Sequence, residues 1–166
     1  YNGNVTSFTT TIFDNDEPGN IQSDQEGFFT PETYPSMRSV WTDEFEENTL
    51  NLDNWSYEIG NGCNQGICGW GNQELQDYTS QEENITIRDG KLVITARNDN
   101  GNYTSARIKT EDKVELQYGR IDIRARLPEG QGIWPATWML GANISEVGWP
   151  SCGEIDIMEL VGNEPS

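Results

Sequence analysis

The run Gly153-Glu154-Ile155-Asp156-Ile157-Met158-Glu159 alternates acidic and apolar side chains, and this period of two predicts a β-strand. In a regular strand Glu154, Asp156 and Met158 would share one face, and Glu159 would lie on the other, where a buried carboxylate is costly. A β-bulge at Ile157-Met158 adds one residue and returns Glu159 to the face of the other two acids. The sequence therefore predicts a bulged strand with three carboxylates in a row.

Short β-strands are also predicted for most of the chain before this strand. Val, Ile, Thr and aromatic residues are interrupted by 17 Gly and 7 Pro, which is typical of an all-β protein with many turns. The dipeptide Asp89-Gly90 predicts a two-residue hairpin turn between strands at 84–88 and 91–96. Further strands are expected at 40–42, 103–109, 118–127, 134–140 and 154–160, with helical turns only at 50–55 and 71–78. The predicted architecture is a β-sandwich.

The first 36 residues differ in composition from the rest of the chain. A strand is conceivable at 5–13, and an acidic, proline-containing stretch follows it to Pro35. We interpret residues 1–36 as a linker or the tail of a preceding module, and residues 37–166 as part of one domain. An N-terminal extension that lies on the domain is the alternative.

The charge of the chain narrows the classes of function. Ten basic and 28 acidic residues give a formal net charge of −18, and there is no His. Nucleic acids and anionic membrane surfaces require Lys/Arg patches, so neither is an expected partner, and no stretch approaches the roughly 20 apolar residues of a membrane helix. The lack of His removes His-based triads and most zinc sites. Any catalytic chemistry must therefore use carboxylates. Solubility in a salty or extracellular medium is an alternative explanation of the negative charge.

The row of carboxylates at 154–159 suits one reaction in particular. Retaining glycoside hydrolysis needs an ionised carboxylate that attacks the anomeric carbon and a protonated one that donates to the leaving oxygen, about 5–5.5 Å apart. A solvated acidic edge strand or a calcium site would show the same pattern. The residues alone leave these three interpretations open.

A resemblance to a known family favours catalysis. The run from Glu154 to Glu159 resembles the active-site motif of glycoside hydrolase family 16, in the form that carries the extra bulge residue. The resemblance implies that Glu154 is the nucleophile, Glu159 the general acid/base, and Asp156 the residue that supports the nucleophile. It also implies a concanavalin A-like β-jelly-roll sandwich. The bulged form is typical of laminarinases, agarases and carrageenases, whereas bacterial lichenases lack the extra residue.

Other segments resemble the laminarinase-like members of that family, and the match runs from about residue 40 to residue 165. These segments lie at 69–78, 103–108, 118–121, 132–140 and 148–150. The resemblance implies an endo-acting, retaining endo-1,3(4)-β-glucanase whose substrate is neutral β-1,3-glucan of the laminarin type, with mixed-linkage β-1,3-1,4-glucan as a further substrate. No cofactor is expected for catalysis, and a secreted, cell-surface or periplasmic location is expected.

Aromatic and polar residues near these motifs are candidate substrate contacts. An indole offers a flat apolar platform to the axial C–H groups of a sugar. The resemblance places Trp134, Trp138 and Trp149 at the cleft; Trp134 and Trp149 are favoured as platforms, and core packing is the alternative, most of all for Trp138. Three polar side chains are suited to bidentate hydrogen bonding of hydroxyls, and the resemblance implies that they contact substrate in the glycone subsites: Asn72, Glu74 and Arg107. For Glu74 a structural ion pair with Arg107 is the alternative.

Three Cys residues and five sequons bear on the cellular setting. Cys63 and Cys68 flank a short Gly-containing loop and are a candidate disulfide, with free thiols as the alternative, while Cys152 is left over as a small buried residue. N-glycosylation in a eukaryotic host would use the sequons at Asn4, Asn54, Asn84, Asn102 and Asn143.

Many members of the family bind a structural Ca²⁺ on the convex side. The resemblance places main-chain ligands at Glu44 and Gly90, with a further Asp ligand beyond the end of this sequence. It also implies more strands after residue 166, which would close both sheets and supply the other cleft wall. We therefore expect an N-terminal part of a catalytic domain, with little or no activity by itself.

Three other functions remain as alternatives. A related marine galactan hydrolase of the agarase or carrageenase type is disfavoured by the charge and by the segment at 70–78. A non-catalytic β-glucan-binding protein on the same fold would typically have lost the acids. A structural adhesion β-sandwich leaves the carboxylate row unexplained.

Overall fold

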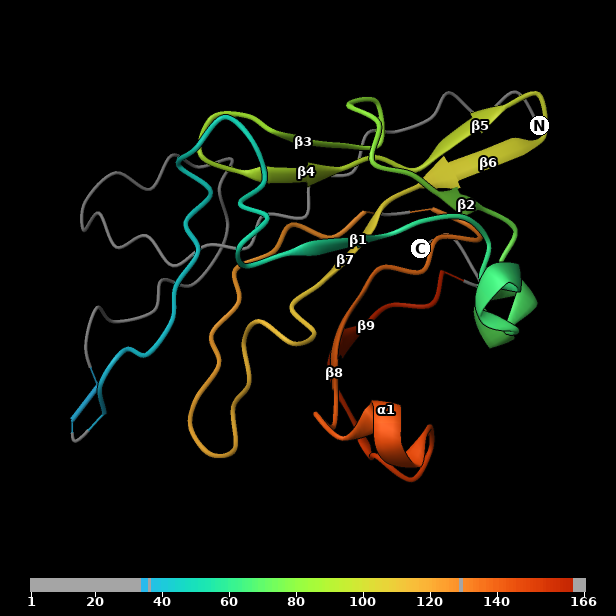
Figure 1. The fold of residues 1–166 in the computed structure, drawn as a ribbon. Coiled ribbons are helices and arrows are strands. Elements are labelled where there is room, and N and C mark those ends of the chain that lie inside the picture. The colour runs from blue at the N-terminus through green and yellow to red at the C-terminus, as the bar shows by residue number, and fades with distance from the viewer. Residues whose placement is uncertain (1–33, 36, 129, 163–166) are drawn as a thin grey trace.

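The computed structural model describes residues 34–35, 37–128 and 130–162, and all structural statements below refer to these residues. They form short β-strands with very little helix, as the sequence predicts (Figure 1). The strands are β1 Ser56–Glu58, β2 Asp77–Tyr78, β3 Ile85–Ile87, β4 Leu92–Ile94, β5 Arg97–Asp99, β6 Asn102–Ser105, β7 Arg107–Lys109, β8 Ala136–Leu140 and β9 Glu154–Glu159. The helices are the 3₁₀ turns η1 Cys63–Gln65 and η2 Cys68–Gly71 and the single-turn α1 Ile144–Val147.

The described strands pair in four small groups: β1 with β7, β3 with β4, β8 with β9, and a three-stranded group in which β6 lies between β2 and β5. The turn between β3 and β4 has positive φ at both central residues, 54° at Asp89 and 64° at Gly90. Two successive positive φ values match the twist of a two-residue hairpin, so the predicted turn is confirmed. The turn between β5 and β6 also has positive φ at both central residues, 53° at Asn100 and 93° at Gly101.

The hydrophobic core lies between the segment 41–55 and the strands β1, β3, β4 and β7. Its buried members are Phe45, Leu50, Trp55, Ile85, Leu92 and Ala106. Asp43 fixes the segment because its carboxylate accepts hydrogen bonds from the Phe45 main-chain N–H at 3.0 Å and from Trp55 Nε1 at 2.7 Å. Burial of each large apolar side chain contributes about 1.5–3 kcal/mol.

Asn84 is a buried polar residue beside this core, with 3% of its surface exposed. Its amide donates to the Thr95 carbonyl at 2.9 Å and to Thr104 Oγ1 at 3.1 Å, and its carbonyl accepts from Thr79 Oγ1 at 2.7 Å. These bonds connect the start of β3, the end of β4 and strand β6. The Asn84 side chain is therefore inaccessible in the folded chain, and Asn84 is removed from the candidate glycosylation sites.

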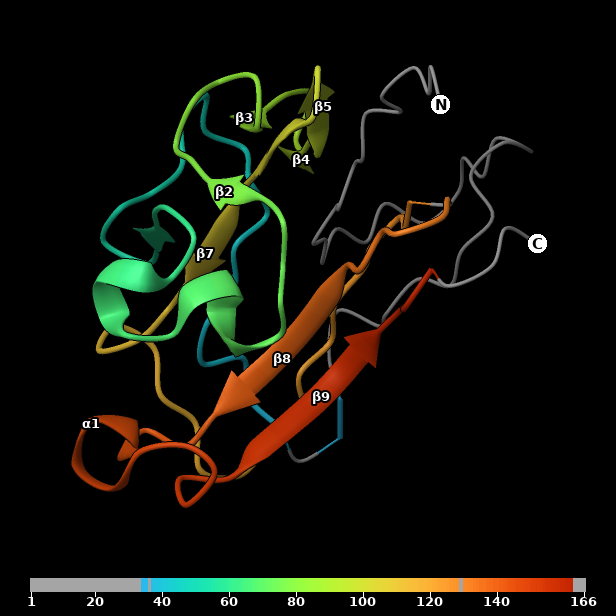
Figure 2. The ribbon, with the colours of Figure 1, turned by 90° about the vertical axis from the view of Figure 1, so that its right-hand side faces the viewer.

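Strands β8 and β9 form a separate antiparallel hairpin that carries the acidic run (Figure 2). Thr137 pairs with Met158 and Trp138 pairs with Asp156, so Ile157 has no partner on β8. An unmatched residue on one strand is a β-bulge. The bulge predicted at Ile157-Met158 is confirmed. Among the described residues β9 has β8 as its one strand partner, and Ile155 is 63% exposed.

Several predicted elements differ from the structure. Residues 40–42 and 118–127 form no strand. Residues 50–55 form a turn as predicted, in which the Trp55 main-chain N–H donates to the Asn51 carbonyl at 3.0 Å. In the stretch 71–78 the structure has the end of η2 and then strand β2 rather than a helical turn through its length. An alternating sequence becomes a strand only where a neighbouring strand accepts its ladder hydrogen bonds, and within 118–127 a single residue, Arg124, has a β-bridge.

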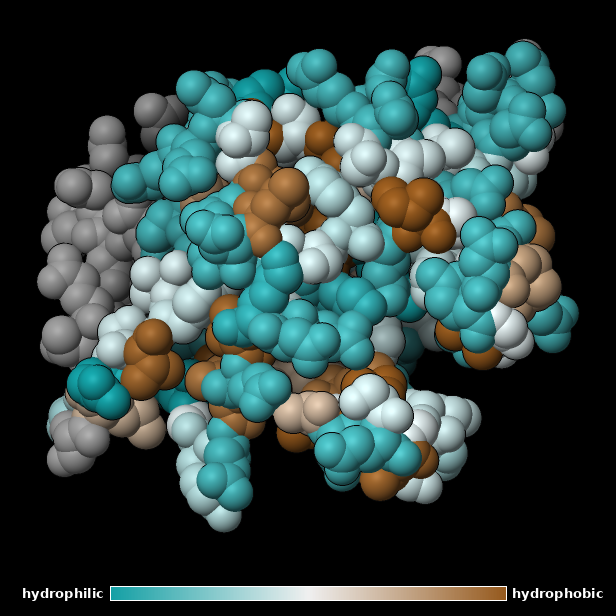
Figure 3. Space-filling view, viewed as in Figure 1, coloured by the Kyte–Doolittle hydropathy of each residue, from teal (hydrophilic) through white to brown (hydrophobic). Residues whose placement is uncertain are grey.

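The predicted linker, residues 1–36, lies outside the described residues except for Tyr34 and Pro35. Tyr34 contacts the domain: its hydroxyl donates to Asp122 at 2.7 Å, and the Arg120 guanidinium lies 4.1 Å from its ring. None of the helices in the described part has the length and apolarity to span a membrane. The face drawn in Figure 3 is mostly hydrophilic, with apolar residues in separate small patches.

Candidate active site

The bulge in β9 places three carboxylates on one face of the β8–β9 hairpin. Residues that pair directly across two antiparallel strands project to the same side, and alternate residues of β8 share a side. All three acids of β9 pair with residues of β8 that are two positions apart and so share one side of that strand. The pairs are Glu154 with Leu140, Asp156 with Trp138, and Glu159 with Ala136. The sequence-predicted catalytic residues are thus brought together in the order Glu154, Asp156, Glu159.

Each outer acid of this row accepts a hydrogen bond from a Trp indole. Trp149 Nε1 donates to Glu154 Oε2 at 2.5 Å, and Trp134 Nε1 donates to Glu159 Oε1 at 2.7 Å. These two hydrogen bonds restrict the acid side chains, so the indoles hold both acids in place. The rings themselves stay accessible, with 67% of Trp149 and 45% of Trp134 exposed. Both predicted platforms can therefore meet a ligand while they position an acid.

Trp149 is presented by the segment that connects β8 to β9. Helix α1 ends at Val147, and its C-cap residue Gly148 has a φ of 70°, a conformation in which a side chain would be strained. The Cys152 main-chain N–H then donates to the Gly148 carbonyl at 3.0 Å, and the Gly153 N–H donates to the Pro150 carbonyl at 3.1 Å. These turns bring the chain back beside Glu154. Cys152 is a free, half-buried thiol in this turn.

The third predicted Trp, Trp138, belongs to an aromatic cluster around Arg107. The guanidinium carbon of Arg107 lies 4.0 Å from the Trp70 ring centroid, 5.3 Å from that of Tyr78 and 5.6 Å from that of Trp138. A cation over the face of an aromatic ring is attracted by the ring quadrupole. Trp138 is half-buried in this position. The ion pair of Arg107 is with Glu58, a residue that the sequence did not single out, rather than with Glu74.

Glu74 is instead the acceptor of a local network. Gln76 Nε2 donates to it at 2.6 Å, the Tyr78 hydroxyl at 2.9 Å and Asn72 Nδ2 at 3.4 Å. Burial, followed by the charge of Glu74, raises the pKa of the Tyr78 phenol, so the hydroxyl stays protonated and donates. The two candidate substrate contacts Asn72 and Glu74 therefore lie together, with Gln76 and Tyr78 as members of the network to which the sequence assigned no role.

The structure joins Cys63 and Cys68 in a disulfide, with 4.0 Å between their Cα atoms. The loop that it closes leads directly into Trp70, which is 6% exposed and whose Nε1 donates to the Gly60 carbonyl at 3.1 Å. Gly62 is required here because its φ is 82° and an added Cβ would lie 2.4 Å from the Ile67 carbonyl oxygen. The disulfide loop thus fixes the ring that lies closest to Arg107.

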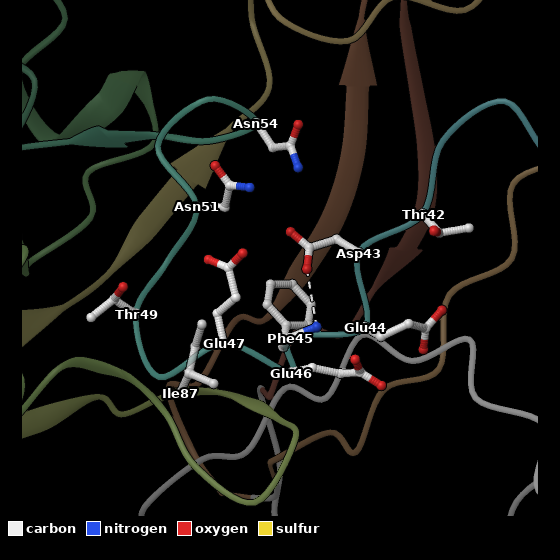
Figure 4. A pocket seen from close by; sticks show the side chains of 10 residues that line it. All are labelled: Thr42, Asp43, Glu44, Phe45, Glu46, Glu47, Thr49, Asn51, Asn54 and Ile87. Atoms are coloured by element: carbon white, nitrogen blue, oxygen red, sulfur yellow. Dashed lines mark hydrogen bonds between the residues drawn. The ribbon is translucent and has the colours of Figure 1, made fainter.

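Glu44, a predicted calcium ligand, lines a pocket between the segment 42–54 and β3 (Figure 4). Its lining residues are Thr42, Asp43, Glu44, Phe45, Glu46, Glu47, Thr49, Asn51, Asn54 and Ile87. Within the described ranges no three His, Cys, Asp or Glu side chains gather as a metal ion would require. The predicted calcium ligands are the main-chain carbonyls of Glu44 and Gly90. The lack of a side-chain cluster therefore does not test this prediction. Calcium at this place stays a prediction.

Comparisons with known proteins point to one family. The sequence model described as "Glycosyl hydrolases family 16" matches residues 72–166. "Glucan endo-1,3-beta-glucosidase A1" of Niallia circulans is 43% identical over 159 residues, which cover 86% of this chain and 23% of that protein. "Beta-glucanase" of Rhodothermus marinus is 46% identical over 138 residues, which cover 79% of this chain and 46% of that protein.

A solved structure agrees with the fold. The crystal structure of laminarinase from Flavobacterium sp. UMI-01 matches with a TM-score of 0.73 and 55% sequence identity over 77% of this chain and 54% of that chain. The predicted jelly-roll class is confirmed by this match together with the strand content. The chain spans about half of that laminarinase and less than half of the two curated relatives.

Proposed function

Since this chain belongs to glycosyl hydrolase family 16, we propose that the protein of which it forms part is an endo-acting hydrolase of β-1,3-glucan. The named relatives, a glucan endo-1,3-beta-glucosidase, a beta-glucanase and a laminarinase, support this substrate class. The observation that carries the proposal is the bulged register of β9, which sets Glu154, Asp156 and Glu159 on one face of the hairpin.

The proposed reaction is a double displacement with net retention. In the first step the Glu154 carboxylate forms a bond to the anomeric carbon, the glycosidic C–O bond breaks, and Glu159 gives its proton to the leaving oxygen. In the second step Glu159 takes a proton from water, whose oxygen attacks the anomeric carbon and releases Glu154. Asp156 lies between the two on the same face, where it can support the nucleophile. Trp149 and Trp134 keep the two acids in place through their indole N–H groups.

A neutral polysaccharide suits the surface of this chain. The formal net charge is −18, which repels a sulfated polymer such as carrageenan. The exposed rings of Trp134 and Trp149 lie beside the acids and offer flat apolar surfaces to sugar rings. We propose laminarin-type β-1,3-glucan as the main substrate and mixed-linkage β-1,3-1,4-glucan as a further one. A galactan hydrolase and a non-catalytic glucan-binding protein remain the alternatives.

Reducing-sugar release by the full-length protein tests this proposal. We expect activity on laminarin, less on mixed-linkage glucan, and none on agarose or carrageenan. Glu154→Ser removes the nucleophile and should lower the rate on laminarin by roughly four orders of magnitude or more. Glu146→Ser, which changes an exposed Glu of α1 in the same hairpin, is the matched control and should keep the wild-type rate. Laminarin hydrolysis that survives Glu154→Ser refutes the assignment.

Structural calcium is a separate proposal, supported by the resemblance and by the place of Glu44 beside an acidic pocket. The ion would link main-chain carbonyls of two segments and would take no part in the chemistry. We expect the melting temperature of the full-length protein to fall in EDTA and to recover with CaCl₂ but not with MgCl₂. An identical melting temperature in all three conditions would contradict the proposal.

A secreted, cell-surface or periplasmic location is also proposed. The disulfide between Cys63 and Cys68 supports it, because disulfides persist mainly in oxidising compartments. Fractionation of the source cells should recover the protein outside the cytoplasm, and recovery in the cytoplasm alone would argue against it.

A further inference from the structure

The aromatic cluster around Arg107 joins parts of the chain that lie far apart in sequence. Trp70 comes from η2, Tyr78 from β2 and Trp138 from β8, and the guanidinium carbon lies 4.0 to 5.6 Å from their three ring centroids. Trp138 in turn pairs with Asp156 of the catalytic strand. One cation thus links the side of the molecule formed by η2 and β2 to the hairpin that carries the acids.

The position of this cation is set by Glu58. Strands β1 and β7 pair antiparallel with Glu58 directly opposite Arg107, so the two side chains project to the same side. Arg107 Nε donates to one carboxylate oxygen of Glu58, and Lys109 Nζ lies 3.1 Å from the other. Because both oxygens are engaged and only 16% of the Glu58 side chain is exposed, the carboxylate has little freedom. Its bond to Nε fixes the plane of the guanidinium over the rings.

We propose that Glu58 is a positioning residue for substrate binding, which acts through Arg107 to hold Trp70, Tyr78 and Trp138 against the catalytic hairpin. This inference rests on the proposed function. Without the Glu58 charge, Arg107 would be a half-buried cation without that counter-ion, and hydration would draw its guanidinium away from the rings. The rings would then lose their common partner, and Trp138, the half-buried ring among them that is a candidate substrate contact, would lose its fixed place beside Asp156.

The structure also separates this role from the chemical step. Glu154 and Glu159 are held by Trp149 and Trp134, and neither bond involves Glu58 or Arg107. Loss of Glu58 should therefore weaken binding while the acids stay in place. A merely structural ion pair would behave differently, because its loss would lower the melting temperature and leave KM unchanged.

The chain offers a matched control in Glu111. Its carboxylate shares Lys109 with Glu58, and 40% of its side chain is exposed. Lys109 is sensitive to both acids: burial lowers the pKa of its ammonium, but hydrogen bonds to Glu111 and Glu58 outweigh burial and raise it. Glu111→Gln removes one partner of Lys109 and leaves the ion pair between Glu58 and Arg107 intact. Any effect common to Glu58→Gln and Glu111→Gln is therefore due to Lys109.

The test compares Glu58→Gln, Glu58→Asp and Glu111→Gln with wild type in the full-length protein. Steady-state kinetics on laminarin oligosaccharides should show a KM about tenfold higher for Glu58→Gln with kcat within about threefold of wild type. Glu58→Asp should recover part of the affinity, and Glu111→Gln should match wild type. An unchanged KM in Glu58→Gln, or an equal rise in Glu111→Gln, overturns the inference.

A second readout keeps the inference independent of activity. The near-ultraviolet circular dichroism of buried Trp residues depends on the rings and charges beside them. Glu58→Gln should change this signal and Glu111→Gln should not, whether or not laminarin is the substrate. A wild-type protein that is inactive on laminarin would refute the proposed function alone, whereas an unchanged signal in a folded Glu58→Gln would refute the positioning role.

Discussion

Trp149 has two properties that a single substitution can separate. Its ring is 67% exposed, and its indole N–H donates to the Glu154 carboxylate. Trp149→Phe keeps a flat apolar ring and removes the donor. We expect kcat to fall about tenfold with a smaller change in KM, because a hydrogen bond to a charged group contributes about 1.5–3 kcal/mol when buried and less at this exposure.

Trp41→Phe is the control for this substitution. The Trp41 indole N–H is buried and has no hydrogen-bond partner in the described structure, so its removal costs no bond. The kcat of both variants on laminarin measures the contribution of the hydrogen bond between Trp149 and Glu154. Equal kcat values for the two variants would mean that the bond to Glu154 contributes nothing to the rate.

Asn84 stabilises the molecule far from the acids. Asn84→Ala would leave the Thr79 hydroxyl, the Thr95 carbonyl and the Thr104 hydroxyl without this partner in a buried place. Each unsatisfied buried group costs about 1–3 kcal/mol, so we expect the free energy of unfolding to fall by at least about 2 kcal/mol. Urea unfolding of the full-length protein measures it. Asn102→Ala, at an exposed sequon, should change little, and a similar loss in both variants would contradict the account.

At the scale of the element, the bulge in β9 predicts the result of a deletion. Thr137 pairs with Met158 and Trp138 with Asp156, so removal of Ile157 would leave a regular ladder with every other pair unchanged. In that ladder the period of two keeps Glu159 on the face of Glu154 and Asp156. We therefore expect the Ile157 deletion to retain measurable activity on laminarin.

Glu159→Gln provides the comparison, since it removes the acid and leaves the strand intact. General acid–base catalysis contributes typically 10²- to 10⁴-fold, so this variant should be about a hundredfold slower than wild type or worse. The rate of the deletion variant should lie well above it. If the deletion variant folds but is as slow as Glu159→Gln, the need to place Glu159 on the face of the other two acids does not explain the bulge.

The elements also show how far the sequence could predict the structure. The hairpin at Asp89-Gly90 and the bulge in β9 are local features, so turn residues and alternation within a few positions predicted both. Residues 118–127 alternate as well, yet they form no strand, because a strand also needs a neighbour that no local pattern reveals.

In the candidate site, too, the sequence predicted the local features and missed those that depend on residues far apart in the chain. The three acids lie within six residues of one another, and a local pattern with a family resemblance identified them. Glu58 was missed because its role depends on the pairing of β1 with β7, which brings together residues 49 positions apart. The bond of Glu74 to Tyr78 spans only four positions, but the sequence could not show which partner Glu74 would take.

At the scale of the whole molecule, the hydrophobic core and the candidate catalytic acids are located in different parts of the chain. The buried core lies between the segment 41–55 and strands β1, β3, β4 and β7, whereas the acids lie on the β8–β9 hairpin, whose other face exposes Ile155. The chain matches 54% of a laminarinase. We expect the 166-residue chain alone to hydrolyse laminarin poorly or not at all, and side-by-side assays with the full-length protein at equal concentration measure the difference. Equal rates would show that these residues suffice.

The stereochemistry of the reaction tests the central claim, that Glu154 attacks the anomeric carbon while Glu159 transfers the proton. Proton NMR can follow the first minutes of laminarin oligosaccharide hydrolysis by the full-length protein, before mutarotation mixes the anomers. Two successive displacements retain configuration, so the new reducing end should appear first as the β anomer, with the α anomer growing in later. An α anomer that appears first would mean direct attack by water and would contradict the account.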